Sequence, residues 1–308
     1  MGAISCIVGD HCSLKRLDRY ISENIRLFTR SQIKTRGLKV KVNGKNVKLS
    51  RIIKPGDFLE LEWEDLPPDG IIPQNIPLDI VYEDERCIVI NKQQGLVVHP
   101  GAGNRQGTLA NAIYYRKLQK RNDIQKNINN TSKNLRAGIV HRLDKETSGL
   151  IICAYDDEAH HFLSEQFKTR KVKKTYLAIV QGRLDDKNGR LETFIARDGG
   201  NRKRFSVSNN GKFAVTLYKA LKTWDTYSLV LLRPKTGRTH QLRLHMKYLG
   251  HPVLGDALYG RTDKIFPDAS LMLHSKTLEI TIPGENEARI FTLPVPKRFM
   301  DVIYKINN

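Results

Sequence analysis

The stretch of sequence that is most informative about both fold and chemistry is GIVHRLDKETSGLIICAY, residues 138 to 155. An apolar, strand-like start runs into polar residues and then resumes as a second apolar run, so Asp144 falls where a strand meets a turn. If residues 141 to 144 are extended, Arg142 and Asp144 point to the same face and share one cleft. Taken alone, an Asp before a polar turn is more typical of a turn or helix-cap residue than of a catalytic one.

A second segment, FKTRKVKKTYLAIVQG at residues 167 to 182, places an aromatic residue behind a run of cations. Lys173 and Lys174 belong to a basic cluster just before Tyr176, which heads an apolar strand. This pattern suits a nucleic acid, because the cations hold the backbone while the ring stacks on a base. A core tyrosine behind a solvated charge run explains the spacing equally well.

A third segment, RPKTGRTHQLRLHM at residues 233 to 246, predicts a Gly-bearing turn and then a helix that begins near Thr239. Arg238 comes just before that helix, where its guanidinium can reach a carboxylate or phosphate without competing for the helix's own hydrogen bonds. For Arg243 we expect an exposed position on a surface helix.

The chain beyond residue 77 predicts an α+β fold with one large mixed or antiparallel sheet, because strand-like runs alternate with a few helical ones. Residues 117 to 136 are polar and lack periodicity, so we expect a mobile surface loop there. The strand-like runs are LDIVYE, CIVIN, LIICAY, TYLAIVQG, AVTLYKAL and YSLVLL, and the helical ones are TLANAIYYRKL, DEAHHFLSEQFK and THQLRLHMKYLG.

A Pro-rich segment, residues 64 to 77, predicts a linker between a small domain at 1 to 63 and a larger one at 78 to 308. Residues 15 to 62 hold 13 Lys or Arg against 5 Asp or Glu, a balance of 13 − 5 = +8. RLDRYISENI there predicts an amphipathic helix, a second helix is expected behind Thr29, and KVKVNGKNVKL predicts a hairpin that turns at Asn43 and Gly44. A solvated charged face on an ordinary small domain is the competing interpretation.

The whole chain has 308 residues and 52 Lys or Arg against 32 Asp or Glu, a formal charge of +20. With 40% hydrophobic residues it can bury a core, and so large a positive excess indicates a polyanionic partner, for which nucleic acid is favoured over a lipid surface. Four scattered cysteines form no zinc motif and fit a reducing cytoplasm. We therefore expect no membrane partner, metal or small-molecule cofactor.

HRLDKETSG, KKTYLAIVQG and TGRTHQLRLH resemble the three signature motifs of the RluA-type pseudouridine synthases. With VVHPG, GTLANA, GHPVLGDALYG and LHSKTLEI, the resemblance spans about residues 78 to 300. The small domain resembles the alpha-L RNA-binding domain of ribosomal protein S-four type, carried by family members that modify large-subunit ribosomal RNA.

This resemblance implies a cytoplasmic, cofactor-independent isomerase that converts specific uridines of large-subunit ribosomal RNA, free or in a pre-ribosomal particle, to pseudouridine. Asp144 aligns with the nucleophile, Arg238 with its cationic partner, and Tyr176 with a residue that stacks on the flipped base and lies near its C5 proton. Arg142 aligns with an arginine that fills the space the base leaves. The remaining residues expected to bind RNA are Arg30, Ser31, Lys34, Arg36, Lys41, Asn43, Lys173 and Lys174. A monomer is expected.

Two alternatives stay open. One is the same reaction on transfer RNA, and the other is a non-catalytic RNA-binding ribosome-assembly factor that keeps the fold. The sequence also leaves open whether Asp144 attacks C1′ directly, assists a glycal route or adds to C6 of the base.

Overall fold

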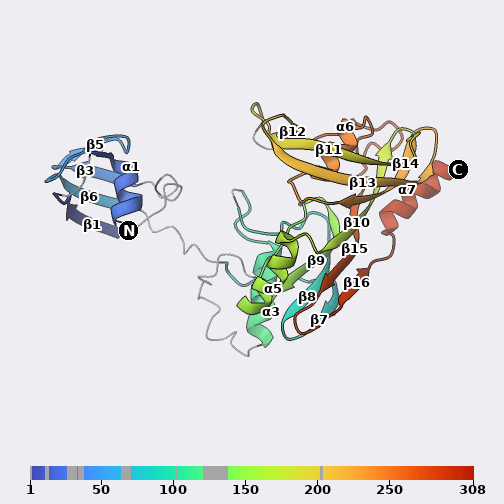
Figure 1. The fold of residues 1–308 in the computed structure, drawn as a ribbon, viewed down its shortest axis with the longest axis horizontal. Helices are drawn as coiled ribbons and strands as arrows, with labels where there is room; N and C mark the ends of the chain where they lie inside the picture. The colour runs from blue at the N-terminus through green and yellow to red at the C-terminus, as the bar shows by residue number, and fades with distance from the viewer. Residues whose placement is uncertain are drawn as a thin grey trace. The chain divides into compact units, whose positions relative to one another are not determined.

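The computed structural model describes residues 2–10, 14–25, 33, 38–63, 71–101, 103–120, 138–201 and 204–308. The chain divides into two compact units, Met1–Asp69 and Gly70–Asn308, which are drawn in Figure 1. The helix expected after Thr29, with Arg30, Ser31, Lys34 and Arg36, lies outside the described residues.

The first unit is built on a four-stranded antiparallel sheet in the order β1-β6-β3-β4. A helical segment packs its apolar side chains Leu17, Tyr20 and Ile21 into the core with the sheet, as the sequence predicted. The elements are β1 (Gly2–Ile7), β2 (Lys15–Arg16), α1 (Leu17–Tyr20), the π-helical turn η1 (Ile21–Ile25), β3 (Lys39–Val42), β4 (Lys45–Asn46), β5 (Ile52–Ile53) and β6 (Phe58–Trp63).

The predicted hairpin at Asn43 and Gly44 is confirmed. Both residues have positive φ, 51° and 75°, as a two-residue turn whose twist matches its strands requires. The Asn43 side chain donates to Asp57 Oδ1 at 2.8 Å and accepts from the Phe58 amide at 2.8 Å. The side chain that we expected to contact RNA therefore ties the hairpin to β6.

The second unit is built on a ten-stranded sheet in the order β12-β11-β13-β14-β10-β15-β9-β8-β7, with β16 also paired to β15. Strands β9 and β15 are parallel and the other pairs are antiparallel, so the predicted mixed sheet is confirmed. The strands are β7 (Ile80–Glu83), β8 (Cys87–Lys92), β9 (Ser148–Ala154), β10 (Lys173–Gln181), β11 (Asn188–Arg197), β12 (Phe205–Val207), β13 (Lys212–Thr223), β14 (Tyr227–Pro234), β15 (Leu273–Thr281) and β16 (Ala288–Thr292).

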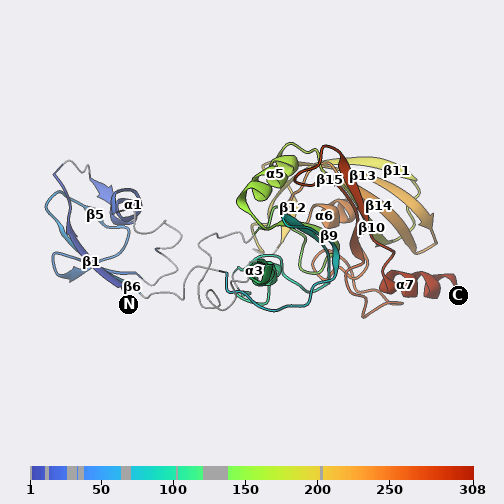
Figure 2. The ribbon, with the colours of Figure 1, turned by 90° about the horizontal axis from the view of Figure 1, so that it is seen from below.

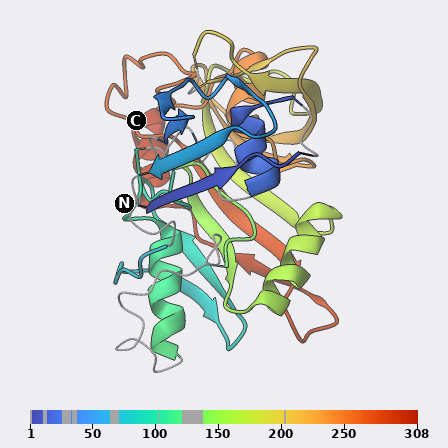
Figure 3. The same cartoon turned by 90° about the vertical axis from the view of Figure 1, so that its left-hand side faces the viewer.

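Strands β8 and β9 are buried on both faces because two helices cover them from opposite sides. Ile88 and Ile151 share a cluster with Leu109 of α3 (Leu109–Lys120). Their neighbours Val89 and Ile152 share another with Leu163 of α5 (Asp157–Lys168). Figure 3 shows α3 and α5 on the two sides of these strands. This explains why both strands are almost continuously apolar in sequence.

Helix α6 (Gln241–Tyr248) contacts β11, β12, β13 and β14 (Figure 2). The last helix, α7 (Lys297–Asn307), buries Phe299 and Val302 and was not anticipated, nor were β11, β12, β15 and β16. Among the described residues, none of the helices combines the length and apolar character needed to cross a membrane.

Two segments differ from expectation. Residues 117 to 120, expected in a mobile loop, form the last turn of α3, and the rest of that segment lies outside the described residues. Residues 71 to 77, expected in the linker, lie in the second unit. Ile71 is buried and the Asn111 side chain donates to Ile72 O at 2.7 Å, which fixes this end of the segment to α3.

Candidate active site

A cavity of about 100 Å³ in the second unit brings together the three segments singled out in the sequence. Its walls come from the loop before β9, from β10, from the turn between β14 and α6, and from the start of α6. They include Asp144, Tyr176 and Arg243. Because these elements are far apart in sequence but neighbours around the sheet, one carboxylate, one phenol and one guanidinium meet in a single small space.

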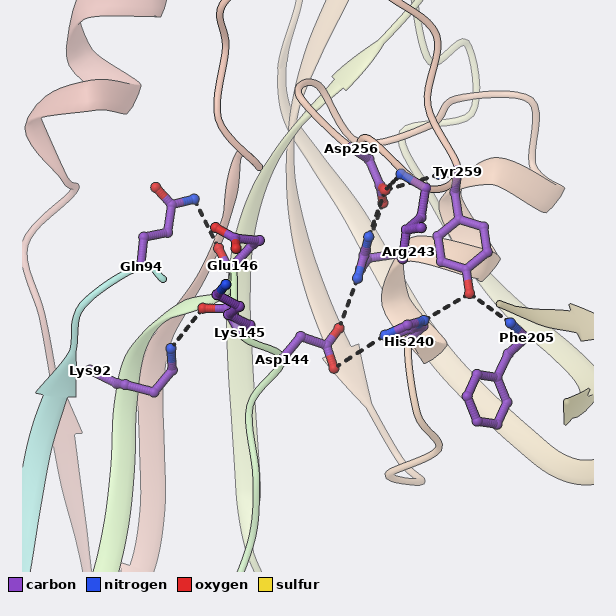
Figure 4. A network of polar contacts seen from close by, with 11 residues as sticks. Lys92, Gln94, Asp144, Lys145, Glu146, Phe205, His240, Arg243, Asp256 and Tyr259 are labelled. Carbon is purple, nitrogen blue, oxygen red and sulfur yellow. Dashed lines mark hydrogen bonds and ion pairs between the residues drawn. The ribbon is translucent and has the colours of Figure 1, made fainter. Parts of the chain in front are cut away.

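The loop that carries Asp144 is held by Lys92, the last residue of β8, and by Gln94 just after that strand (Figure 4). Lys92 is fully buried, and its ammonium donates to Gln93 O at 2.9 Å, Leu96 O at 2.9 Å and Lys145 O at 3.1 Å. The Gln94 amide donates to Glu146 O at 2.8 Å. Both side chains bind the backbone just after Asp144, so the end of β8 fixes the position of the loop that carries the carboxylate.

Burial lowers the pKa of Lys92 to about 8, partly offset by the negative charges of Glu146 and Asp144. The three carbonyl oxygens satisfy all three donors of the ammonium. Lys92 therefore links the backbone of the loop at Lys145 to the end of β8.

On the other side of the cavity, Arg243 bridges two carboxylates. Its Nε and Nη2 donate to Asp256 Oδ2 and Oδ1, both at 2.7 Å, and its Nη1 lies 3.3 Å from Asp144 Oδ2. Asp256 also accepts the amides of Leu258 and Tyr259 at 2.9 and 3.0 Å. Asp256 therefore anchors the guanidinium, and Arg243 presents its remaining donor to Asp144, as Figure 4 shows.

The pKa shifts agree with this arrangement of Arg243 between Asp256 and Asp144. Burial alone would raise the pKa of Asp256, but the hydrogen bonds and charge of Arg243 outweigh it and hold the pKa below its usual value. Burial opposes the charged form of Arg243, yet Asp256 and then Asp144 raise its pKa. The expectation of an exposed Arg243 was wrong, since the residue is only 6% exposed.

His240 is a second neighbour of Asp144, with Nε2 3.9 Å from Oδ1. Its Nδ1 lies 2.8 Å from the Tyr259 hydroxyl, which accepts the Phe205 amide at 2.9 Å. The hydroxyl can donate its own hydrogen to Nδ1, which leaves the imidazole hydrogen on Nε2, facing the carboxylate. Burial lowers the pKa of His240. A neutral imidazole thus points an N–H toward Asp144, and Arg243 carries the balancing charge.

Arg238, expected to pair with Asp144, lines the cavity but makes a different contact. Its Nε donates to Phe213 O at 3.0 Å, and the ion pair of Asp144 with an arginine is made by Arg243. The reason is geometric: Arg238 lies in the turn before α6, whereas Arg243 is on the helix itself, above the loop that carries Asp144. The cationic partner of Asp144 is corrected to Arg243.

Tyr176 lies on β10 and lines the same cavity as Asp144, with 7% of its surface exposed. Burial raises its pKa to about 12, a hydrogen bond with Ser275 opposes this, and the charge of Asp144 adds to it. The phenol is therefore protonated at neutral pH and available as a hydrogen-bond donor at the cavity wall.

The described residues that were expected to bind RNA lie in different places. Arg142 and Lys174 line the cavity. Lys173 points to the other side of β10 and forms an ion pair with Glu279 at 2.5 Å. Lys41 lies on β3 of the first unit, half-buried.

Sequence reasoning missed Lys92, His240, Asp256 and Tyr259. A lysine at the end of an apolar strand carries no signal of burial, because lysine is almost never fully buried. Asp256 and Tyr259 stand in the GHPVLGDALYG segment that supported the family resemblance, but in a turn where no periodicity shows which way a side chain points.

Comparison with known proteins identifies this arrangement. The RNA pseudouridylate synthase family model matches residues 86–248, which contain Asp144, Tyr176 and Arg243. Ribosomal large subunit pseudouridine synthase D of Borreliella burgdorferi is 46% identical, covering 92% of this chain and 87% of the relative. An uncharacterized RNA pseudouridine synthase of Aquifex aeolicus is 40% identical, covering 94% and 92%.

Among solved structures, human RNA pseudouridylate synthase domain containing 1 matches with a TM-score of 0.57 at 26% identity, over 76% of this chain and 96% of that one. The chain belongs to the RNA pseudouridylate synthase family and is an isomerase that acts on RNA. Its RluA-type resemblance and its pseudouridine synthase fold are confirmed.

Proposed function

We propose that this protein converts specific uridines of large-subunit ribosomal RNA to pseudouridine and that Asp144 is its nucleophile. The observation that carries the proposal is Asp144 itself: a carboxylate in a small cavity, held by Arg243 at 3.3 Å and facing a buried tyrosine. Several relatives, including that of Borreliella burgdorferi, are named ribosomal large subunit pseudouridine synthase D, which supports the choice of RNA.

The reaction breaks the bond between N1 and C1′, turns the uracil, and joins C5 to C1′, while a proton leaves C5 and N1 gains one. Nothing is added or removed, so no redox partner is required. Glycosidic cleavage calls for a carboxylate at the sugar carbon or the base, and Asp144 supplies it. Arg243 balances the negative charge of that carboxylate and fixes where its oxygens point.

A uridine must leave its stack to reach this cavity. Tyr176 offers its ring to the flipped base and its hydroxyl to the region of the C5 proton. Arg142, two residues before Asp144 and exposed at the rim, is suited to fill the space the base vacates. These roles rest on the cavity lining together with the family resemblance.

We also propose that the first unit contains an RNA-binding domain of the alpha-L type, which the sequence places at residues 1 to 63. Its support is the balance of +8 over residues 15 to 62. Removing residues 1 to 70 should weaken binding to ribosomal RNA and flatten its salt dependence, because fewer phosphates are neutralised. Equal affinity with and without these residues, at every salt concentration, would contradict this role.

The substrate is tested by mapping pseudouridine in ribosomal and transfer RNA of cells that lack the protein, by carbodiimide labelling and primer extension. Loss of specific large-subunit sites, restored by the wild-type gene, is the expected result. Loss confined to transfer RNA would move the substrate there, and no change in either RNA would favour an assembly factor. We expect the protein to be cytoplasmic and monomeric. Sedimentation of the purified protein tests whether it is a monomer.

A further inference from the structure

A second cavity, of about 380 Å³, adjoins the catalytic one and is lined by six cations and no carboxylate. Arg142, Lys174, Pro234, Thr236, Gly237 and Arg238 line both cavities, so the two adjoin each other. The cations that line this second cavity are Arg142, Lys168, Arg170, Lys174, Lys235 and Arg238.

Few of these cations are neutralised by the protein. Lys168 pairs with Glu165 at 3.1 Å, and Arg238 donates to a backbone carbonyl. Within the part of the chain that the structure describes, no ion pair to a carboxylate is found for Arg142, Arg170 or Lys235. Uncompensated positive charge concentrated around one hollow is a favourable environment for an anion.

Lys174 adds a partly desolvated amine to this wall. It is half-buried, its ammonium lies 5.6 Å above the Phe167 ring, and burial lowers its pKa. An anion in the cavity would restore to this amine the electrostatic stabilisation that burial removes.

The backbone conformation of Arg170, at the end of α5, is an independent observation. Helix α5 ends in a Schellman motif, in which the Arg170 amide donates to Phe167 O at 3.3 Å and the Lys171 amide to Gln166 O at 3.0 Å. The residue after the cap in this motif has positive φ and is usually glycine. Here it is Arg170 with φ of 60°, a left-handed conformation that is unfavourable for most residues with a Cβ. The helix end alone would be better served by glycine, so the helix cap does not explain the arginine at this position.

We propose that this second cavity binds a phosphodiester of the RNA strand next to the nucleotide in the catalytic cavity, with Arg170 and Lys235 as phosphate ligands. The inference rests on the proposed function, because it takes RNA as the substrate. It assigns to the end of α5 the task of holding the strand beside the flipped nucleotide. The planar fork of an arginine suits two phosphate oxygens, and the lysine adds a point charge.

The test compares full-length Arg170→Gly with wild type for binding to unmodified large-subunit ribosomal RNA transcribed in vitro. Binding is measured by filter retention from about 50 to 200 mM salt. We expect roughly tenfold weaker binding, the effect of one charge-assisted contact. The slope of log K against log salt should become shallower by about 0.7 to 0.9. The thermal midpoint should equal or exceed that of wild type, because glycine fits the left-handed position.

Arg170→Asn and Lys235→Gln repeat the test with residues of a different kind, since asparagine also tolerates positive φ. Lys187→Gln/Lys219→Gln is the control, because both lysines are exposed and line neither cavity. Affinity and slope equal to the control for Arg170→Gly, Arg170→Asn and Lys235→Gln would overturn the proposal. A wild type that binds RNA with this dependence but forms no pseudouridine would refute the proposed reaction and leave the phosphate site standing.

Discussion

Asp256→Asn tests the view that Asp256 anchors Arg243 and, through it, orients Asp144. The Asp256 side chain is fully buried and accepts two hydrogen bonds from Arg243, both at 2.7 Å. Asparagine keeps one acceptor oxygen but turns an NH₂ group toward the guanidinium. One charge-assisted hydrogen bond and the compensating charge are lost together.

The expected destabilisation follows from the burial. Removing one partner of a buried ion pair costs about 3 to 5 kcal/mol. Arg243 retains Asp144 at 3.3 Å as a partner, which is 19% exposed, so we expect the lower end of this range. A loss of about 3 kcal/mol corresponds to a fall of roughly 6 to 12 °C in the midpoint of a unit of this size. Turnover should fall as well, because Arg243 is free to move away from Asp144.

The assay exploits the two tryptophans of the chain, Trp63 in the first unit and Trp224 in the second. In a Trp63→Phe background, fluorescence follows only the unfolding of the second unit. Asp301→Asn is the control, because it removes a carboxylate from an exposed i,i+4 pair with Lys297, worth only about 0.3 to 0.5 kcal/mol.

Arg243→Met/Asp256→Leu separates stability from activity. Replacing both buried charges by apolar groups should restore at least half of the lost stability. Activity should be lost in this double variant, since Asp144 no longer has a cation beside it. The reasoning is refuted if Asp256→Asn costs no more stability than Asp301→Asn, or if the double variant turns over like wild type.

Two further predictions concern groups around the cavity. Tyr176→Phe keeps the aromatic ring but loses the hydroxyl. If the phenol takes part in proton transfer, the single-turnover rate should fall at least tenfold with little change in RNA affinity. A rate equal to that of wild type would limit the role of Tyr176 to stacking. The pKa of Lys92 is about 8 in the folded protein and about 10.4 in the unfolded chain. At a pH between these two pKa values the unfolded state binds more protons than the folded state. The free energy of unfolding therefore rises with pH in this range. The free energy of unfolding of wild type minus that of Lys92→Met, from urea melts, should therefore increase from pH 8 to about 10, and a flat or falling difference would contradict the burial of a charged amine.

The sequence predicts most of the fold of the second unit because its strands are local apolar runs. CIVIN and LIICAY become β8 and β9, and the helix predicted from DEAHHFLSEQFK has the bounds of α5. Strand β11 was not predicted because only about every second residue in it is apolar. Leu191 and Ile195 are buried, and Glu192 between them is exposed. Local patterns thus identify buried strands more readily than half-exposed ones.

The sequence also singled out Asp144, which lines the cavity, but not the arginine that pairs with it. Periodicity on a helix identifies a buried face only when the opposite face is exposed, and in α6 every residue from Gln241 to Met246 is buried. Arg243 therefore looked like an ordinary surface arginine, while Arg238 looked well placed. The choice between them depends on Asp256, a residue 13 positions after Arg243 that only the tertiary structure brings to the guanidinium.

The most direct test of the central claim compares purified wild type with Asp144→Asn on unmodified large-subunit ribosomal RNA, reading pseudouridine by carbodiimide labelling and primer extension. Asparagine keeps the size of the side chain and most of its hydrogen bonding but removes the nucleophile. The account predicts that wild type modifies specific uridines, whereas Asp144→Asn binds the RNA with similar affinity and forms no pseudouridine. Pseudouridine formed by Asp144→Asn at the same sites and at a comparable rate would contradict the assignment of Asp144.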